Sequence, residues 1–542
     1  MRVKVGKYTY LYESESYRNE NGEPRNNRKL IGKVDPATGK YIFKQEYLDR
    51  TTTDGKPSTT TDGQPSTTTD GKPIKAQPNG ASFSEEDIRL STVLNYGSFY
   101  LYKKLAEQMG LMTVLQEALP SCWKEVFNLA SYLISTGDPF SYCEDWLERT
   151  DALPVGPMPS QRISELLAGI DQLDRDRFYH LWCSHRSESE YLALDITSTS
   201  SYSELIESVE WGYNRDGEKL PQINICLLMG FESRYPIYQS IYGGSLKDVT
   251  TLTTTIQTFQ ALAGEKQMIA VMDKGFFSAK NVNTMLSDKH HVDFIIAVPF
   301  TNKFAKELVK SEKKDIDTLK NTIVCGKESL RAITKVRSWN KEHKVYAHVY
   351  YNARKAHGIR ENLFANVATL REQAMLQPEK YVNDRKYTKY LIIRRSEREA
   401  SGYTVNLRED VVEVELETAG WMVVISNFMT DAKEAIRIYR EKDIVEKGFC
   451  RLKNTLDMGR LRVHSEESTQ NKLFVGFISL ILLSGIHNVM VEQMLYRTMT
   501  MKKLIMTLSK LKVQFVKGVR ILFPVTKAQR DIYKAFGIKV PM

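Results

Sequence analysis

The sequence EYLALDITSTS, at residues 190–200, begins a region where apolar runs of strand length alternate with helical patterns. Its strand, expected over 191–196, is followed by two more apolar runs, at 223–229 and 236–242. Downstream the same reading predicts a helix at 250–263, a strand at 267–272, a helix at 279–287 and a strand at 294–298. This order predicts an α/β domain whose first three strands form an antiparallel meander.

Acidic residues stand at the ends of two of these predicted strands. Asp195 ends the apolar run of EYLALD, and Asp273 follows IAVM just before a glycine turn. Open α/β sheets bind ligands beyond the carboxyl ends of their strands, so both carboxylates are candidates for a site. An aspartate at such a position is also a common turn or cap residue. Neither Asp195 nor Asp273 by itself therefore shows that a functional site is present.

The alternation stops over residues 300–428, where β-like runs are separated by polar segments. These runs, which predict a β-rich insertion, are 345–351, 390–394, 411–416 and 421–425. A long helix over 431–456 follows, opened by a capping signature at Asp431 and Glu434. A second, strongly apolar helix is predicted over 473–486.

Four side chains of the predicted 431–456 helix share one face. At 100° per residue, they fall within about 60° of each other. They are Tyr439, Lys442, Glu446 and Lys453. An acid that ligates metal, beside bases that contact phosphate, suits a site for a metal ion and a nucleic-acid backbone. A ladder of surface ion pairs would have similar spacing, so the pattern leaves both readings open.

The chain of 542 residues is long enough for roughly three to four domains. Residues 1–50 predict a small β module, and 51–83 contain the repeat TTTDGKPS, which lacks large apolar residues and predicts a flexible linker. Residues 84–189 carry helical patterns, which suit a DNA-binding domain and equally a plain helical bundle.

The net charge of +10 is concentrated at the C-terminal end of the sequence. Residues 496–542 hold eleven Lys or Arg and one acid, Asp531, so the rest of the chain sums to zero. We expect a basic C-terminal tail there, outside the catalytic region. Such a surplus of positive charge indicates a polyanionic partner, with nucleic acid favoured over membrane.

The remaining compositional features predict a cytoplasmic protein without a membrane partner. The six cysteines form no Cys-x-x-Cys pair, and the first residues have no apolar core of signal-peptide type. The apolar stretch at 473–486 would span only about 21 Å as a helix, less than a hydrocarbon layer of roughly 30 Å. It is better explained as a buried core helix.

Three segments, taken in order, carry a resemblance to a known family. LALDITSTS, VMDKGFFS and the pattern Y-x2-K-x3-E-x6-K in YREKDIVEKGFCRLK resemble the signature of DDE transposases from bacterial insertion sequences. The segments IYGGSLKDVTTL and SNF are also similar to theirs, and the likeness extends over about 190–490. At Lys442 the family more often has arginine, whose planar fork binds phosphate in a bidentate way that lysine lacks.

The resemblance implies a multidomain α/β protein with an RNase H-like mixed-sheet core at 190–299 and 429–495, interrupted by the β-rich insertion at 300–428. It implies that Asp195, Asp273 and Glu446 are catalytic and bind two Mg²⁺ or Mn²⁺ ions. Without metal, three carboxylates held together repel one another, so we expect a loose site.

The implied reaction is cleavage of double-stranded DNA at the terminal inverted repeats of the element, followed by strand transfer to target DNA. The implied assembly is a homodimer or higher oligomer on paired ends. A transposase-derived DNA-binding protein that does not cleave, and an RNase H-like nuclease, are the alternatives.

Further DNA contacts are expected from Tyr439, Lys442 and Lys453, and two residues outside the signature are weaker candidates. Trp339, in KVRSWNKEH, is a candidate for holding a flipped base, although a partly buried loop tryptophan is the simpler reading. His464, in the basic loop GRLRVHS, is a candidate for a DNA contact.

Overall fold

The computed structural model describes the backbone of 2–5, 8–18, 24–34 and 41–43, and both backbone and side chains of 83–185, 190–263, 268–399 and 401–542. The predicted linker over 51–83 lies outside the described residues apart from Phe83. The N-terminal strands form a four-stranded antiparallel sheet in chain order. They are β1 (Arg2–Val5), β2 (Tyr8–Arg18), β3 (Pro24–Val34) and β4 (Tyr41–Phe43).

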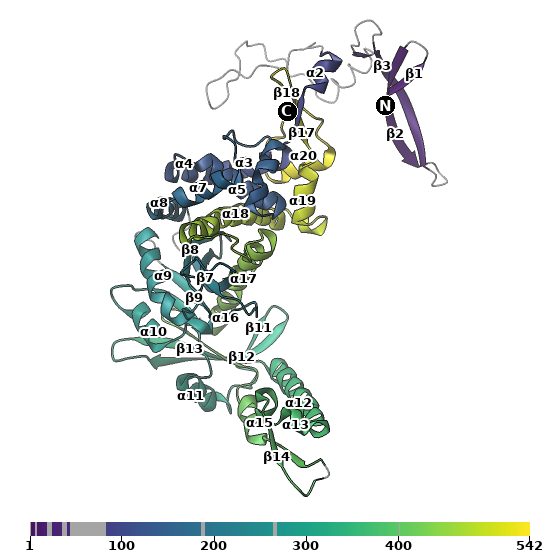
Figure 1. The fold of residues 1–542 in the computed structure, drawn as a ribbon. Coiled ribbons are helices and arrows are strands. Elements are labelled where there is room, and N and C mark those ends of the chain that lie inside the picture. Colours follow the sequence, from purple (N-terminus) through teal and green to yellow (C-terminus); the bar gives the residue numbers. More distant parts are fainter. Residues whose placement is uncertain are drawn as a thin grey trace. The chain divides into compact units, whose positions relative to one another are not determined.

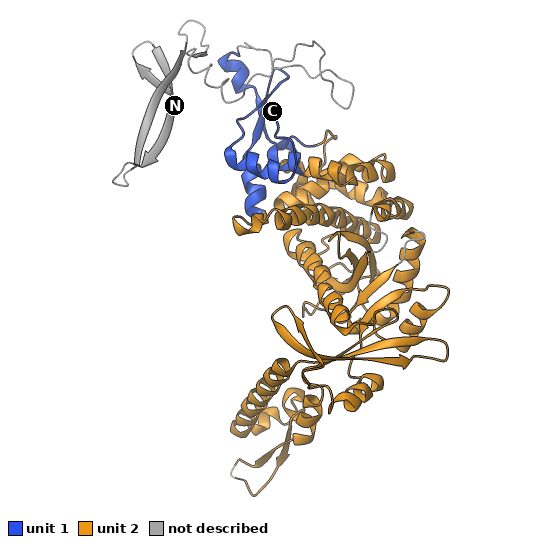
Figure 2. Ribbon diagram, turned by 180° about the vertical axis from the view of Figure 1, so that it is seen from behind, with its two compact units in different colours: residues 1–101, 147–152, 502–542 blue, residues 102–146, 153–501 orange. Residues whose placement is uncertain are grey.

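The chain divides into two compact units (Figure 2). Unit 1 comprises Met1–Leu101, Leu147–Ala152 and Lys502–Met542, and unit 2 comprises Tyr102–Trp146 and Leu153–Met501. The segment 84–189, which the sequence predicts as one helical domain, is therefore shared between the two units.

Unit 1 joins segments that lie more than 400 residues apart in the sequence. Strand β5 (Thr92–Asn95) pairs antiparallel with β17 (Lys512–Val516), which pairs with β18 (Val519–Leu522). Helix α20 (Lys527–Ala535) follows, and its buried Tyr533 donates a hydrogen bond of 2.9 Å to the carbonyl of Gly97. The prediction of a tail over 496–542 is wrong, because 502–542 belong to folded unit 1, where apolar side chains such as Leu504, Val513 and Ile532 are buried.

Short helices surround one long apolar helix in unit 2. They are α4 (Leu111–Ala118), α5 (Trp123–Thr136), α7 (Ser160–Gly169), α8 (Gln172–Ser184) and the first four residues of α6 (Cys143–Glu148), whose last two belong to unit 1. The long helix, α18 (Glu466–Glu492), is buried without interruption from Leu473 to Ile486 and contacts α5 and α7. Among the described residues it alone is long and apolar enough to cross a membrane, but 83% of its most apolar window is buried inside the protein. This burial favours the predicted core helix.

A nine-stranded mixed sheet forms the centre of unit 2 (Figure 1). Its order is β11-β12-β13-β16-β10-β9-β6-β7-β8. The antiparallel meander predicted from the sequence is confirmed as β6 (Tyr191–Ser200), β7 (Gln222–Gly230) and β8 (Pro236–Gly243). Strand β9 (Ile269–Met272) then runs parallel to both β6 and β10 (Asp293–Ala297). The helices between these strands, α9 (Asp248–Ala263) and α10 (Ala279–Leu286), also lie where the sequence predicts them. The protein is therefore a multidomain α/β protein with a mixed-sheet core.

The segment 300–428 differs from the predicted β-rich insertion, because part of it extends the central sheet and much of the rest is helical. Four of its strands belong to the sheet: β11 (Thr322–Cys325), β12 (Glu328–Ser338), β13 (Lys344–Tyr351) and β16 (Trp421–Ser426). The other elements are α11 (Lys303–Glu312), α12 (Ala353–Leu376), α13 (Pro378–Tyr381), α14 (Arg385–Thr388), α15 (Glu409–Leu416) and the hairpin of β14 (Leu391–Arg395) and β15 (Tyr403–Leu407).

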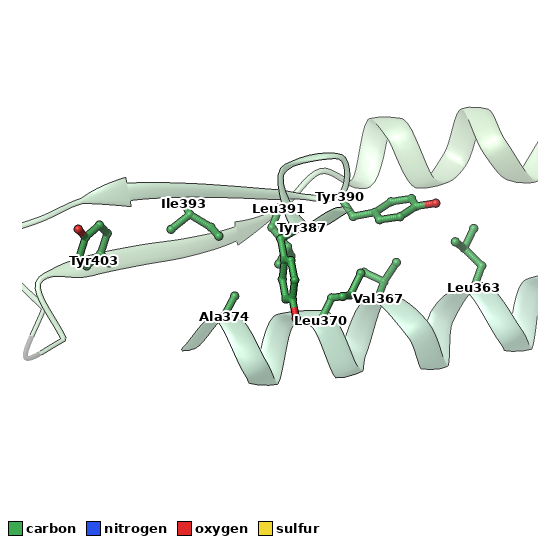
Figure 3. Close-up of a cluster of buried hydrophobic side chains, with 9 residues drawn as sticks. All are labelled: Leu363, Val367, Leu370, Ala374, Tyr387, Tyr390, Leu391, Ile393 and Tyr403. Atoms are coloured by element: carbon green, nitrogen blue, oxygen red, sulfur yellow. The ribbon is translucent and has the colours of Figure 1, made fainter. Parts of the chain in front are cut away.

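The strand predicted at 411–416 is wrong, because these residues form most of α15. Their apolar and acidic residues alternate as in a strand, but Val412 and Leu416, one helical turn apart, pack against the core shown in Figure 3. In that core, one face of α12 points toward the β14–β15 hairpin and its flanking tyrosines. The buried members are Leu363, Val367, Leu370, Ala374, Tyr387, Tyr390, Leu391, Ile393 and Tyr403.

The helix predicted over 431–456 is present but interrupted at Lys442. It consists of α16 (Ala432–Glu441), α17 (Asp443–Cys450) and a π-helical turn at Arg451–Thr455. Asp431 caps α16 by accepting hydrogen bonds from the backbone N–H groups of Lys433 and Glu434. Helix α17 packs on β6 and β7 through the buried Gly448, where a Cβ atom would lie 3.2 Å from Leu227 Cδ2.

We expect Gly448→Leu to destabilise the protein by about 1–3 kcal/mol, because a larger side chain overpacks the contact between α17 and β7. Gly358 is the matched control: it is also helical, in α12, but a Cβ there meets no atom within 4 Å. Gly358→Leu should leave the urea midpoint unchanged or raise it. Equal midpoints for the two variants would contradict the close packing of α17.

Candidate active site

The register of two parallel strands brings Asp195 and Asp273 together. Leu194 of β6 lies opposite Met272 of β9, so the next residue of each strand is an aspartate at the same level. Asp273 follows β9 directly, as predicted, and starts a short 3₁₀ turn. Asp195 does not end its strand, however, because β6 continues to Ser200 by pairing with β7.

The Asp195 carboxyl lies in a position that favours a nearby positive charge. Burial raises its pKa to about 6, and the negative charge of Asp273 acts in the same direction. The backbone N–H of Ile196, at 2.8 Å from Asp195 Oδ1, and the charges of Lys442 and Arg215 only partly offset this rise. A cation placed between the two aspartates would therefore be stabilised.

The residues Tyr439 and Lys442 connect the aspartates to Glu446. The Tyr439 hydroxyl donates a hydrogen bond of 2.8 Å to Asp273 Oδ1, and Lys442 Nζ donates one of 3.1 Å to Glu446 Oε1. Lys442 Nζ also lies 5.8 Å from the centre of the Tyr439 ring. The structure thus brings together five of the eight predicted site residues.

Burial and the adjacent acids set the protonation of these two donors. Burial and the Asp273 carboxylate raise the pKa of Tyr439 well above its ordinary value, so it remains a hydrogen-bond donor. For Lys442, burial lowers the pKa, but the charges of Asp273, Glu446 and Asp195 outweigh burial and leave the pKa raised. The site therefore holds one fixed positive charge beside three carboxyl groups.

The three carboxyl groups do not form a closed metal cage as they stand. Among the described residues, no group of three or more His, Cys, Asp or Glu side chains is placed to hold a metal ion. Glu446 has a side chain that is 55% exposed and points to Lys442. The donor set nevertheless suits a hard divalent cation, because it consists of carboxylate oxygens and Asp195 lacks enough compensating charge.

Lys453 is held in an ion pair rather than facing solvent. Its Nζ lies 2.6 Å from Asp216 Oδ2, and its side chain is only 12% exposed. The pair fixes the π-helical turn after α17 to the loop between β6 and β7. To contact a phosphate as predicted, Lys453 would have to break its ion pair with Asp216.

The β6–β7 loop carries functional candidates that the sequence analysis missed. Arg215 forms an ion pair with Asp248 at the start of α9, and its charge acts on Asp195. Glu218 binds Arg460 through both guanidinium nitrogens, at 2.5 and 2.6 Å. Asp248 lies inside the segment IYGGSLKDVTTL, which could have drawn attention to it, whereas no motif marks Arg215.

The two remaining predicted residues lie in different surroundings. Trp339 is in the turn between β12 and β13, where its Nε1 donates a hydrogen bond of 2.8 Å to Asn283. Its ring packs edge-on against Phe277 and Phe304, which fits the simpler reading of a partly buried loop residue. His464 is exposed and lines a cavity of about 610 Å³ with residues that include Arg460.

Comparison with known proteins gives one family match and a weak structural likeness. A solved structure described as a cryo-EM structure of the piggyBac transposase synaptic complex with hairpin DNA is similar with a TM-score of 0.35 and 11% identity. The likeness covers 65% of this chain and 59% of that one, so this chain spans about three fifths of its length. No curated protein sequence matches the chain. The family model described as the transposase DDE domain matches residues 186–482, more than half of the sequence. The chain therefore belongs to the transposase DDE domain family.

Proposed function

We propose that this protein is a transposase of a bacterial insertion sequence that cuts DNA at the inverted-repeat ends of its element and transfers the strands to target DNA. The observation that carries the proposal is the pairing of Asp195 with Asp273 on adjacent parallel strands, faced by Tyr439, Lys442 and Glu446. The family match supports the transposase class, and the local chemistry supports phosphodiester cleavage.

Asp195, Asp273 and Glu446 would hold divalent metal, which we take to be two Mg²⁺ or Mn²⁺ ions. When bound, such ions activate an attacking water or hydroxyl and stabilise the leaving oxygen of a phosphodiester. The raised pKa of Asp195 supports this assignment, because burial and the charge of Asp273 disfavour its ionised form, which a bound cation would stabilise.

The protein's own residues position these acids. Tyr439 holds Asp273 through its hydroxyl, which fixes the direction of the second carboxylate oxygen. Lys442 neutralises part of the negative charge and keeps Glu446 near the aspartates. A protonated Lys442 is also suited to contact a backbone phosphate, as a point charge rather than a planar fork.

Double-stranded DNA is the proposed partner, with the enzyme acting as a homodimer or higher oligomer on paired ends in the bacterial cytoplasm. The net charge of +10 supports a polyanionic partner. The alternative is a transposase-derived protein that binds DNA without cutting it. A cleavage assay distinguishes the two.

We expect the full chain with Mg²⁺ to cut a linear DNA that carries the genomic sequences from both sides of its gene. Asp195→Ala and Glu446→Ala should each reduce the cleavage rate on the order of 100-fold or more, because each removes an acid that stabilises the reacting charge. Sequencing gels of end-labelled DNA measure the rate, and a gel-shift assay shows that binding is retained. If the wild type and both variants bind the ends and leave them uncut, the silent DNA-binding alternative is correct.

Tyr439→Phe should reduce cleavage by about 10- to 100-fold and raise the Mn²⁺ concentration needed for half-maximal activity, because Asp273 loses the group that orients it. DNA affinity without metal should not change. Tyr142→Phe is the matched control, since Tyr142 is 57% exposed. A loss of activity with an unchanged Mn²⁺ requirement would argue against this positioning role.

Lys442→Arg should preserve DNA binding, whereas Lys442→Ala should lower the slope of log affinity against log salt concentration by about one, as expected for one lost phosphate contact. Fluorescence anisotropy with a labelled duplex at several salt concentrations measures the slope. An unchanged slope in Lys442→Ala would show that Lys442 interacts only with the carboxyl groups of the site and contacts no phosphate.

A further inference from the structure

A second basic surface lies on another face of the helix that carries Glu446. At 100° per residue, Lys447 and Arg451 lie about 100° and 140° around the helix from Glu446. Both line a cavity of about 490 Å³. Arg234, in the turn between β7 and β8, and His487, on α18, also line it.

Two of these arginines lack an acidic partner. Lys447 pairs with Asp443 at 2.7 Å, and the neighbouring Arg440 pairs with Glu328 at 2.6 Å. Within the described part of the chain, no carboxylate forms an ion pair with Arg451 or Arg234. Arg451 is also half-buried, and burial lowers its pKa. A desolvated guanidinium without a counter-ion costs free energy, which a bound anion would recover.

The adjacent histidine responds to the same positive charge. Burial, followed by the charges of Arg451, Arg234 and Lys447, lowers the pKa of His487 to about 4. Its Nδ1 lies 2.8 Å from the Tyr496 hydroxyl. His487 is therefore neutral near pH 7. The two acids that also line the cavity are already paired, Asp443 with Lys447 and Glu441 with Arg437. Arg451 and Arg234 are thus the cations of the lining that no carboxylate neutralises within the described residues.

We propose that this cavity binds a backbone phosphate of DNA through Arg451, in the π-helical turn that follows α17, and Arg234, in the turn between β7 and β8. The inference rests on the proposed transposase function for its choice of DNA. Guanidinium groups suit phosphate because their N–H donors match two phosphate oxygens at once. The cavity contributes binding only, since none of its residues belongs to the acidic site.

Two substitutions in the full chain test the proposal by affinity. Arg451→Gln and Arg234→Asn each remove one charge, and asparagine tolerates the left-handed backbone of Arg234, whose φ is 55°. Each should lower the salt slope of duplex binding by about one. Arg371→Gln, an equal loss of charge on the exposed surface of α12, is the control and should leave the slope unchanged. Slopes that match the control in both variants overturn the proposal, and Arg234→Asn keeps the test valid if Arg451→Gln does not fold.

The titration of His487 provides a readout that does not depend on cleavage. In ¹³C-histidine NMR spectra without metal, a short duplex should raise the pKa of His487 from about 4 toward its ordinary value, because bound phosphate offsets the cations. A rise with inorganic phosphate but not with duplex would overturn the DNA assignment in favour of a free-anion site. If the wild type fails to cut DNA but the duplex still raises the pKa of His487, the proposed function is wrong and the proposed phosphate site is retained.

Discussion

The parallel pairing of β6 with β9 is the constraint on which the candidate site depends. Side chains alternate between the faces of a strand, so a slip of one residue would place Asp195 and Asp273 on opposite faces. The register is maintained on both sides, because β7 pairs along the whole of β6 and β10 pairs along β9. Helix α17 then approaches β6 and β7 closely through Gly448, and its Glu446 pairs with Lys442, whose charge also acts on the two aspartates.

The balance of charge among the site residues is a second constraint on the candidate site. Three carboxyl groups face one ammonium group and one phenol, and burial together with the charge of Asp273 raises the pKa of Asp195 despite the opposing charges of Lys442 and Arg215. The site therefore combines an excess of carboxyl groups with one adjacent ammonium group. An ordinary surface cluster differs in two ways: its acids and bases pair with one another, and solvent screens their charges.

Local patterns in the sequence predict the central part of the fold well. The meander, β9, α9 and α10 follow from hydrophobic periodicity, and the shared helix face predicts that Tyr439, Lys442 and Glu446 act together. The remaining features depend on contacts distant in sequence. The helical state of 411–416 is stabilised by packing on α12, and Lys453 is neutralised by Asp216 from a loop more than 200 residues earlier. Neither partner is visible from a local pattern.

The pairing of β5 with β17 has a consequence for the synthesis of the protein. The strand that satisfies the backbone hydrogen bonds of β5 is made more than 400 residues later, as β17. Unit 1 therefore cannot pair β5 with β17 until residues 512–516 have been made, whereas the central sheet of unit 2 needs nothing beyond Ser426. A chain that ends prematurely after unit 2 would contain the acidic site and lack a finished unit 1.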